Sequence, residues 1–346
     1  METLWFSIVA VMLALYVVFD GFDLGAGIVH LYAARSDEER RVVLQTIGPV
    51  WDGNEVWLLA AGGTLYFAFP ALYASSFSGF YLPLMIVLWL FMFRGLSLEF
   101  RHHFQNALWR PFWDVTFAAS SALLAIVLGA ALGNVVRGVP LDEHGQFFLP
   151  LWTDFRVGPQ PGILDWYTVL VGLGAGLALA VHGALWVVYK TVGEVRDRAQ
   201  RVVRTGWWGV LALTIAMTVA TFFVQPQVPG RLLATPWGLL CPAIALVGLF
   251  LVPWFDRLGA ERDAFLASCA YLVGMLASVA FGVYPFVLPS NADPARGLDI
   301  YEAAAGAYGL RVGLAWFIPG MLLVSAYFVF TYRRLAGKTK VREEGY

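Results

Sequence analysis

The amino-acid sequence predicts an all-α polytopic membrane protein. Of its 346 residues, 59% are hydrophobic and 14% are charged, a balance that water-soluble globular proteins of this length rarely show. The apolar residues gather into nine runs, each near the length of about 20 residues that a helix needs to cross a bilayer core. None of these runs alternates apolar with polar residues as β-barrel strands do, so all nine are expected to be helices.

The expected helices follow one another along almost the whole chain. They cover residues 5–31, 49–69, 78–99, 115–136, 166–189, 207–225, 236–253, 265–288 and 311–332. Met1-Glu2-Thr3 lacks the basic segment of a signal peptide, so we expect the first helix to be retained. The arrangement favours a single integral membrane domain, residues 1–346, with two four-helix bundles, about 5–136 and about 166–288, and one further helix.

The segments that join the helices are short or rich in turn-forming residues. The two longest, about 137–165 and 289–310, contain Pro and Gly and are too short to bury a core of their own. With no soluble domain expected, function is predicted to reside in the membrane.

Lysine and arginine are distributed unevenly between the two sides of these nine helices. One side holds seventeen, the other holds five, and Arg94 lies inside the third helix. The seventeen are Arg35, Arg40, Arg41, Arg101, Arg110, Lys190, Arg196, Arg198, Arg201, Arg204, Arg257, Arg262, Arg333, Arg334, Lys338, Lys340 and Arg342. Because cytoplasmic loops carry an excess of positive residues, the C-terminus is predicted to be cytoplasmic and the N-terminus outside.

Carboxylates interrupt the first two apolar runs. Asp20 and Asp23 are three residues apart in the first helix, and therefore share one helix face. Asp52 and Glu55 repeat this spacing in the first turns of the second helix. Because the first helix runs inward and the second begins at the cytoplasm, both pairs are expected at one depth.

The third helix adds Arg94 and Glu99 to the same layer. An ionised carboxylate in the bilayer costs at least about 2.5 kcal/mol, so these acids should face the protein interior or water. Crowded carboxylates titrate together, as a proton relay requires. A structural reading, in which Asp52 stabilises a helix start and Arg94 neutralises a neighbour, leaves Asp20 and Asp23 unexplained. A proton or cation route is therefore favoured for the group.

Glycines on the first two helices are expected to let helix backbones approach closely. They are Gly21, Gly25, Gly27, Gly62 and Gly63. Plain packing explains such residues more simply than any chemical role.

The histidines and cysteines have no spacing typical of a metal site. His30 and His182 lie inside expected helices without partners at ligand spacing, so hydrogen-bonded core positions are predicted. Cys241 and Cys269 fall at opposite depths and are not expected to form a disulfide. No phosphate-binding loop occurs, and the basic loops are explained by topology, so nucleic acid is not implied.

Five motifs stand in order along the chain. They are DGFDLGAG in the first helix, GPVWDGNEVWL followed by AGG in the second, FSGFYLPL opening the third, the segment from Arg94 to Arg101, and YPFVLPS closing the eighth. This ordered set resembles subunit II of the cytochrome bd-type quinol oxidases. The resemblance covers essentially the whole chain, including the helix count and the outside N-terminus.

The resemblance implies a respiratory terminal oxidase of the bacterial or archaeal cytoplasmic membrane that oxidises quinol and reduces dioxygen to water. It implies two haems b and one haem d, bound chiefly by subunit I, the partner in a heterodimer. Membrane lipid, small single-helix accessory subunits and a structural quinone are further components that it allows. No metal ligand and no directly catalytic residue is expected in this chain.

The resemblance also assigns roles by position. Asp20, Asp23 and Asp52 match acidic residues implicated in carrying protons from the cytoplasm toward haem d. Glu55 joins this proton pathway, at a position where some members carry glutamine. The surrounding motif and support residues are Trp51, Gly53, Asn54, Trp57, Arg94 and Glu99.

Two functions of a different class stay open on the sequence. A proton-coupled secondary transporter would also place carboxylates near helix breaks, and predicts substrate-coupled flux by this chain alone. A purely structural membrane subunit predicts that the acids can be removed without any change in turnover.

Overall fold

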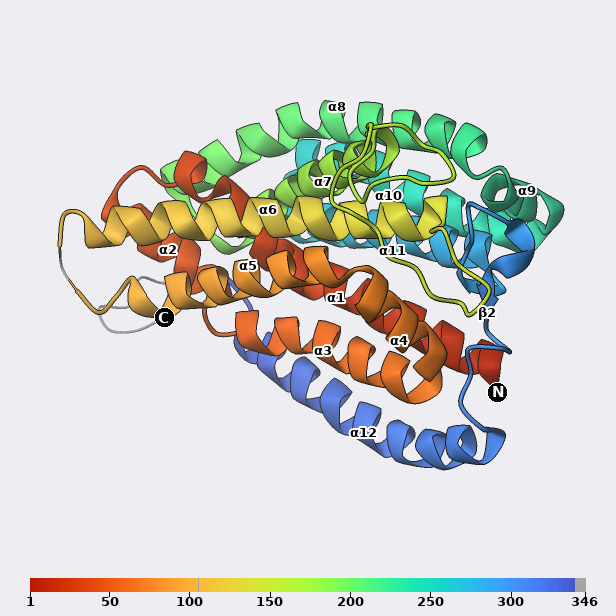
Figure 1. Ribbon diagram of the computed structural model, residues 1–346. Coiled ribbons are helices and arrows are strands. Elements are labelled where there is room, and N and C mark those ends of the chain that lie inside the picture. Colours follow the sequence, from red (N-terminus) through yellow and green to blue (C-terminus); the bar gives the residue numbers. More distant parts are fainter. Residues whose placement is uncertain (105, 340–346) are drawn as a thin grey trace.

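The computed structural model describes residues 1–104 and 106–339. Its long helices run roughly side by side in an elongated bundle, and both α1 (Glu2–Ala33) and α12 (Ala307–Arg334) start at the same end of it (Figure 1). We call this the N-terminal end and the other the far end. Lys340 and Arg342, two of the seventeen basic residues, lie outside the described residues.

Helices account for nearly all of the regular structure. Between α1 and α12 lie α2 (Asp37–Ile47), α3 (Trp51–Ala68), α4 (Pro70–Gly79), α5 (Tyr81–Phe100), α6 (Trp109–Arg137), α7 (Trp166–Lys190), α8 (Gly193–Val224), α9 (Gln227–Ala234), α10 (Leu240–Arg257) and α11 (Glu261–Val283). The short elements are the 3₁₀ turns η1 (Pro236–Leu239) and η2 (Pro294–Arg296) and the strands β1 (Phe286–Leu288) and β2 (Leu298–Asp299).

Eight helices in the described part of the chain are long and apolar enough to cross a membrane: α1, α5, α6, α7, α8, α10 with η1, α11 and α12. The expected helix at 49–69 is present as α3, but Asp52, Asn54 and Glu55 occupy its first turns. These polar residues lower its apolar content, so composition alone does not identify α3 as a membrane span.

Three short helices, α2, α4 and α9, have no counterpart among the expected apolar runs. The start of α2 carries a capping box, in which the Ser36 hydroxyl accepts from the Glu39 backbone N–H and the Glu39 carboxylate accepts from Ser36 N–H. Because α2 has a low mean hydropathy, a search for apolar runs does not detect it. In α4, Pro70 occupies the first helical position, where its missing N–H costs nothing.

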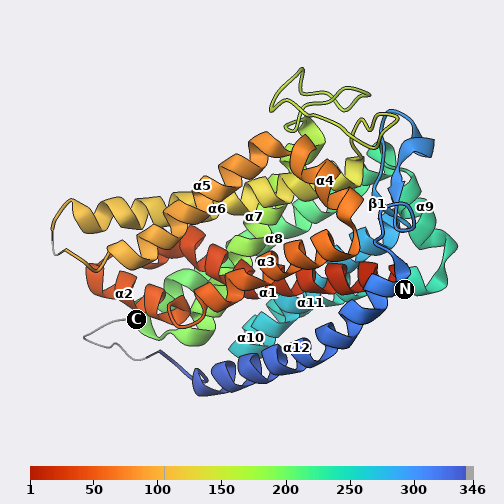
Figure 2. The ribbon, with the colours of Figure 1, turned by 60° about the horizontal axis from the view of Figure 1, so that its bottom comes forward.

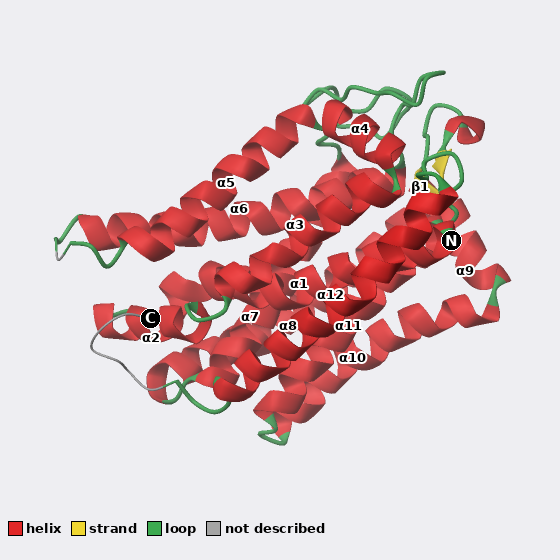
Figure 3. Cartoon of the chain, turned by 90° about the horizontal axis from the view of Figure 1, so that it is seen from below, coloured by secondary structure: helices red, strands yellow, loops and turns green. Residues whose placement is uncertain are grey.

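The expected end of the eighth helix at 288 is wrong. Helix α11 ends at Val283, and Phe286–Leu288 form β1, which pairs antiparallel with β2 (Figure 3). Pro285 is the physical reason, because proline lacks the N–H of a helical hydrogen bond and disfavours the helical conformation in the residue before it.

Helix α7 lies at the centre of the bundle and α12 at its edge (Figure 2). In the most apolar stretch of α7, 83% of residues are buried, whereas in α12 the share is 0%. Helices α1, α6 and α8 surround α7. A helix with no buried apolar stretch must be covered by lipid or by another protein, since its exposed side chains are largely apolar.

Glycines fix the closest helix crossing, which joins α1 to α7. A Cβ atom built on Gly25 would lie 1.9 Å from the Leu179 carbonyl oxygen, and one on Gly183 would lie 2.1 Å from the Gly25 carbonyl carbon. Only glycine fits there. By contrast, a Cβ on Gly62 or Gly63 meets nothing within 4 Å, so the expected close approach at these two positions is wrong within this chain.

The two long connections pack onto the N-terminal end. Leu141 and Phe147 from the first connection, and Leu288 and Ile300 from the second, join Trp5 of α1 in one buried apolar cluster. The Val139 N–H also donates to the Pro289 carbonyl. The connections therefore cap the bundle by sharing its core.

Candidate functional site

Two carboxylates are fully buried on one face of α1. Asp20 and Asp23 each have an exposed fraction of 0%, and both lie in the half of α1 nearer the far end of the bundle. Charged side chains are almost never fully buried unless they are paired. The neighbours of these two residues therefore determine what the site can do.

Arg94 of α5 bridges acids from two other helices. Its side chain is fully buried; Nη2 lies 2.6 Å from Asp20 Oδ1 of α1, and Nη1 lies 3.1 Å from Glu55 Oε2 of α3. The Glu55 side chain is 30% exposed. One cation thus joins three helices, and it connects a fully buried carboxylate to one that reaches the surface of the chain.

Asp23 is held by a side-chain amide instead of a cation. Asn54 Nδ2 of α3 donates to Asp23 Oδ2 at 2.8 Å, and Asn54 itself is 1% exposed. The Tyr332 hydroxyl of α12 donates to Asn54 Oδ1 at 2.8 Å. A hydrogen-bonded chain therefore runs from the edge helix to the second acid of the pair.

Several buried polar atoms around the two acids have few partners among the described residues. Asp23 Oδ1 and Arg94 Nε make no hydrogen bond there, and Asp20, beyond its ion pair with Arg94, interacts only with the Tyr16 hydroxyl. Tyr16 lies one helical turn before Asp20 on α1. Buried polar atoms normally have hydrogen-bond partners, so a group of them in one place fits a site that exchanges protons or binds water.

The other predicted site residues lie around this core with different exposures. Asp52 is exposed at the start of α3 and makes no hydrogen bond or ion pair within the described residues. A Cβ on Gly53 would meet open space. Trp57 is buried and stacks on Phe19, with ring centroids 6.2 Å apart, while Trp51 is half-buried.

Glu99 is not brought to the cluster. It is exposed near the end of α5, and the described residues provide no ion pair to its carboxylate. Arg94, only five positions earlier, faces inward. A separation of five residues places two side chains on different sides of a helix, which explains the difference.

Sequence reasoning missed a second buried ion cluster nearer the far end. Asp114 of α6 is 1% exposed; its carboxylate accepts from Arg101 Nε at 2.6 Å and Arg40 Nη1 at 3.0 Å, and it lies 2.9 Å from His30 Nε2. Arg101 also donates to Asp37 at 2.7 Å. In the sequence, this cluster could have been recognised from an acid at the edge of an apolar run, next to loops with several arginines.

Opposing effects set the ionisation of Arg101, which lies just past the end of α5. Burial alone lowers the pKa of its guanidinium, but hydrogen bonds and charge interactions with Asp114 and Asp37 outweigh burial and raise that pKa above its ordinary value. Arg101 therefore stays charged, and its bonds to Asp37 and Asp114 tie α2 and α6 to the end of α5.

The two membrane histidines are hydrogen-bonded core residues, as the sequence predicts. His182 is 1% exposed, with Nδ1 2.7 Å from Ser268 Oγ and Nε2 3.0 Å from the Val18 carbonyl oxygen. His30 is fully buried against Asp114. Cys241 and Cys269 are both free thiols.

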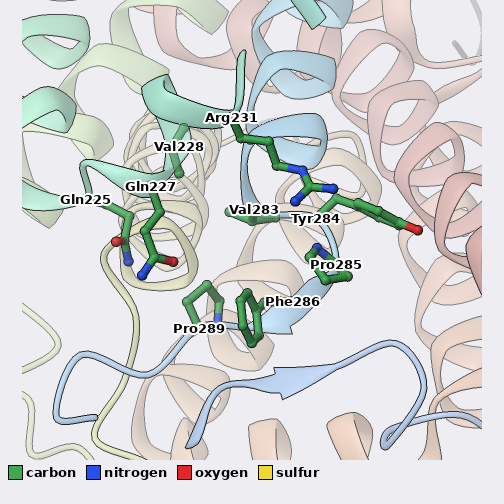
Figure 4. A pocket seen from close by; sticks show the side chains of 10 residues that line it. Gln225, Gln227, Val228, Arg231, Val283, Tyr284, Pro285, Phe286 and Pro289 are labelled. Atoms are coloured by element: carbon green, nitrogen blue, oxygen red, sulfur yellow. The ribbon is translucent and has the colours of Figure 1, made fainter. Parts of the chain in front are cut away.

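A separate cavity of about 100 Å³ lies at the N-terminal end, between the ends of α8 and α11 (Figure 4). It is lined by residues that include Gln225, Gln227, Arg231 and Tyr284, and the Arg231 guanidinium lies 4.8 Å from the centre of the Tyr284 ring. None of the predicted site residues lines it. The cavity is therefore distinct from the acid cluster.

Comparison with known proteins gives consistent results over the whole length. Residues 1–335 match the family model described as cytochrome bd terminal oxidase subunit II. The chain is 30% identical to the "Probable cytochrome oxidase subunit 2" of Haemophilus influenzae, over 97% of this chain and 94% of that protein. It is 27% identical to the "Cytochrome bd-I ubiquinol oxidase subunit 2" of Escherichia coli K12, over 94% and 92% respectively.

A solved structure, "The structure of bd oxidase from Geobacillus thermodenitrificans", is similar with a TM-score of 0.75. The match covers 97% of this chain and 98% of that one. At 18% sequence identity, this similarity shows a shared fold.

Proposed function

Because the chain belongs to the cytochrome bd terminal oxidase subunit II family, we propose that its buried acids carry protons from the cytoplasm toward the site where dioxygen is reduced. The chain is a subunit of a quinol oxidase, an oxidoreductase complex of the bacterial cytoplasmic membrane that contains haem. Reduction of dioxygen to water consumes protons. A buried reaction site therefore needs a proton route from one side of the membrane.

The proposed orientation has nine membrane helices, with α3 as the ninth, the N-terminus outside and the C-terminus cytoplasmic. Arg40, Arg101, Arg198 and Lys338 gather in ion pairs toward the far end of the bundle, which supports assigning that end to the cytoplasm. A membrane-impermeant thiol reagent should label Glu143→Cys, at a side chain that is 79% exposed, from outside intact cells. Labelling only after the membrane is permeabilised would place residue 143 on the cytoplasmic side and contradict the proposed orientation.

The proposed partner is subunit I, which carries two haems b and one haem d and supplies the electron-transfer and dioxygen chemistry. The histidines of the membrane helices do not fit haem ligation in this chain, because both ring nitrogens of His182 are hydrogen-bonded and Nε2 of His30 is paired with Asp114. Quinol is the substrate class of the complex. A structural quinone, membrane lipid and single-helix accessory subunits belong to the same proposal.

The route begins at the exposed acid of α3. Asp52 is exposed, Glu55 one turn later is partly buried, and Arg94 links Glu55 to the fully buried Asp20. Asp23 follows one turn further along the same face of α1. A proton would move inward from Asp52 through Glu55 to the buried pair. Asp20 Oδ2, which lies outside the ion pair with Arg94, and Asp23 Oδ1 are where it would be held.

One observation carries this proposal: the fully buried Asp20 is linked through Arg94 to the partly exposed Glu55, and Asp23, one turn further along α1, keeps an oxygen without a hydrogen bond. A purely structural ion pair needs no spare oxygen and no path to the surface. A bridge that joins α1, α3 and α5 also stabilises the fold, so the structural function stays the second candidate.

The test replaces single acids in the complex purified with its partner. Asp52→Asn should leave haem content normal and lower oxygen consumption about tenfold or more, the order expected when a proton-transfer group is lost. Asp52→Glu should keep part of the activity. Asp263→Asn, at an exposed acid of α11, is the matched control and should turn over normally.

Asp20→Asn and Asp23→Asn complete the test. If all three Asn variants assemble with haem and turn over at the unmodified rate, the acids are structural and the proton route is rejected. Substrate-coupled proton flux by this chain without its partner would instead favour a secondary transporter.

A further inference from the structure

Tyr332 links the edge of the bundle to the acid cluster. It belongs to the last turn of α12, a helix in which only Leu310 is fully enclosed. The Tyr332 ring nevertheless packs inward, with centroids 5.4 Å from Phe19 of α1 and 6.4 Å from Trp186 of α7. Its hydroxyl donates to Asn54 Oδ1 at 2.8 Å. A peripheral helix thus contributes a polar atom to the centre of the proposed site.

The surroundings of Asn54 fix which way its amide points. Two acceptors of α1 face Nδ2: Asp23 Oδ2 at 2.8 Å and the Phe19 carbonyl oxygen at 3.4 Å. An amide nitrogen only donates and an amide oxygen only accepts, so these acceptors hold the nitrogen on the α1 side. Oδ1 must then face α12, where the Tyr332 hydroxyl is its donor within the described residues.

We propose that Tyr332 is a positioning residue that holds the Asn54 amide with its N–H toward Asp23. Without this hydroxyl, the buried Oδ1 has no donor, and a half-turn of the amide would present an oxygen to Asp23 in place of a nitrogen. A carboxylate that faces an oxygen must carry a proton to make a hydrogen bond, whereas one that faces an N–H can lose its proton. Tyr332 thereby keeps Asp23 able to release a proton.

The chain segment after α12 holds Tyr332 in place. We call residues 335–339 the C-terminal strap. The Lys190 ammonium at the end of α7 donates to the Leu335 carbonyl, and the Thr339 N–H donates to the Lys190 carbonyl at 2.7 Å. With the further bonds from Lys190 Nζ to the Gly337 carbonyl and from Lys338 Nζ to the Val188 carbonyl, these contacts with the central helix fix the end of α12 a few residues beyond the tyrosine.

This inference rests on the proposed function only in giving Asp23 a place on the proton route. The hydrogen-bonded chain itself stands on its own contacts. The experiment therefore measures turnover and, separately, the carboxyl group of Asp23. In this way a failure of the proton route can be distinguished from a failure of the positioning role.

The main variant is Tyr332→Phe, made in the complex with its partner, because phenylalanine keeps the ring and removes only the hydroxyl. We expect oxygen consumption to fall about fivefold, the order associated with one hydrogen bond, with haem content and the KM for quinol unchanged. The matched control is Tyr327→Phe on the same helix, where the side chain is 59% exposed. It should behave as the unmodified complex.

A double-mutant cycle separates positioning from general packing. If Tyr332 acts through Asp23, then Tyr332→Phe has no further effect in the Asp23→Asn background. Asn54→Leu, which removes the amide at similar size, should reproduce the effect of Tyr332→Phe and should not add to it. An equal loss in the presence and absence of Asp23 would overturn the inference.

Infrared spectroscopy supplies the second readout. The carboxyl C=O band that disappears in Asp23→Asn identifies Asp23, and this band should shift in Tyr332→Phe and stay in place in Tyr327→Phe. An unmoved band would overturn the inference, even if the proton route stands. A shifted band with normal turnover in Asp23→Asn would support the positioning role and remove Asp23 from the proton route.

Discussion

At the scale of single residues, the stability of the site depends on the small number of groups that pair with its buried acids. Arg94 is the one cation in direct contact with Asp20 and Glu55 among the described residues, and Asp23 has only an amide. Ion pairs taken out of water lose much of their stabilisation to desolvation, but an unpaired buried charge is far worse. The cluster is therefore sensitive to the loss of one partner and tolerant of the loss of a pair.

The first prediction follows from this asymmetry. Arg94→Gln leaves the Asp20 carboxylate buried without a cation and should cost about 3–5 kcal/mol, seen as a lower unfolding temperature of the purified complex. Arg94→Gln combined with Asp20→Asn should recover much of that loss. Arg201→Gln, at an exposed arginine of α8, is the control and should unfold normally. A double variant less stable than Arg94→Gln alone would contradict the argument.

The sequence predicts part of this site well. Asp20 and Asp23 are identified because charge inside an apolar run is costly, and Arg94 and Asn54 because they lie in or beside the same motifs. Tyr332 is not identified, because a tyrosine in a membrane helix is common and its partner lies 278 positions away. Asp114 is missed because it stands at the boundary of an apolar run, where an acid is usually solvated.

At the scale of helices, the bundle is organised by small residues on the central helix. Helix α7 meets α1 at Gly25 and Gly183, where no side chain larger than hydrogen fits. Because α1 carries both buried acids, this crossing also sets how deeply the acids lie. The position of the site is therefore determined partly by a glycine on a helix that contributes none of its charges.

The second prediction concerns that crossing. Gly183→Ala places a Cβ 2.1 Å from the Gly25 backbone and should separate α1 from α7, at a cost of about 1–3 kcal/mol for overpacking. The unfolding temperature and the amount of assembled complex should both fall. Gly230→Ala in α9, where a Cβ meets nothing within 4 Å, serves as the control. Equal stability of the two variants would contradict the close crossing.

Hydropathy predicts the cores of the long helices but not their ends. Helix α8 begins at Gly193 and not near 207, because its first turns are polar and extend past the apolar run. Helix α11 ends at Val283 because of Pro285, a stop signal that a count of apolar residues passes over. Hydropathy does not detect the short helix α2, although the residues of its capping box can be recognised in the sequence.

At the scale of the whole molecule, much apolar surface is left for other components. Large side chains of α12 such as Trp316, Leu323 and Phe330 are at least 58% exposed, and so is Leu59 of α3. The exposed Asp52, two turns before Leu59 on the same face of α3, is better suited to a protein partner, because a charged side chain is costly against lipid.

The third prediction addresses dependence on that partner. Expressed alone, the chain should bind no haem, because both ring nitrogens of His182 are hydrogen-bonded and His30 is fully buried with its Nε2 paired to Asp114. Co-expression with subunit I should yield a one-to-one heterodimer whose absorption spectrum shows haem. Stoichiometric haem in the isolated chain that is lost on His182→Ala or His30→Ala would contradict this expectation.

The hydrogen bond between Tyr332 and Asn54 can form only late in the synthesis of the chain. Asn54 leaves the ribosome 278 residues before its partner, which at about 5–20 residues per second amounts to roughly 14–56 s of synthesis. Throughout that interval α1 and α3 can meet, but the Asn54 oxygen lacks the donor that orients it. A chain truncated anywhere before Tyr332 lacks this donor, so the geometry at Asp23 depends on whether translation has reached the last turn of α12.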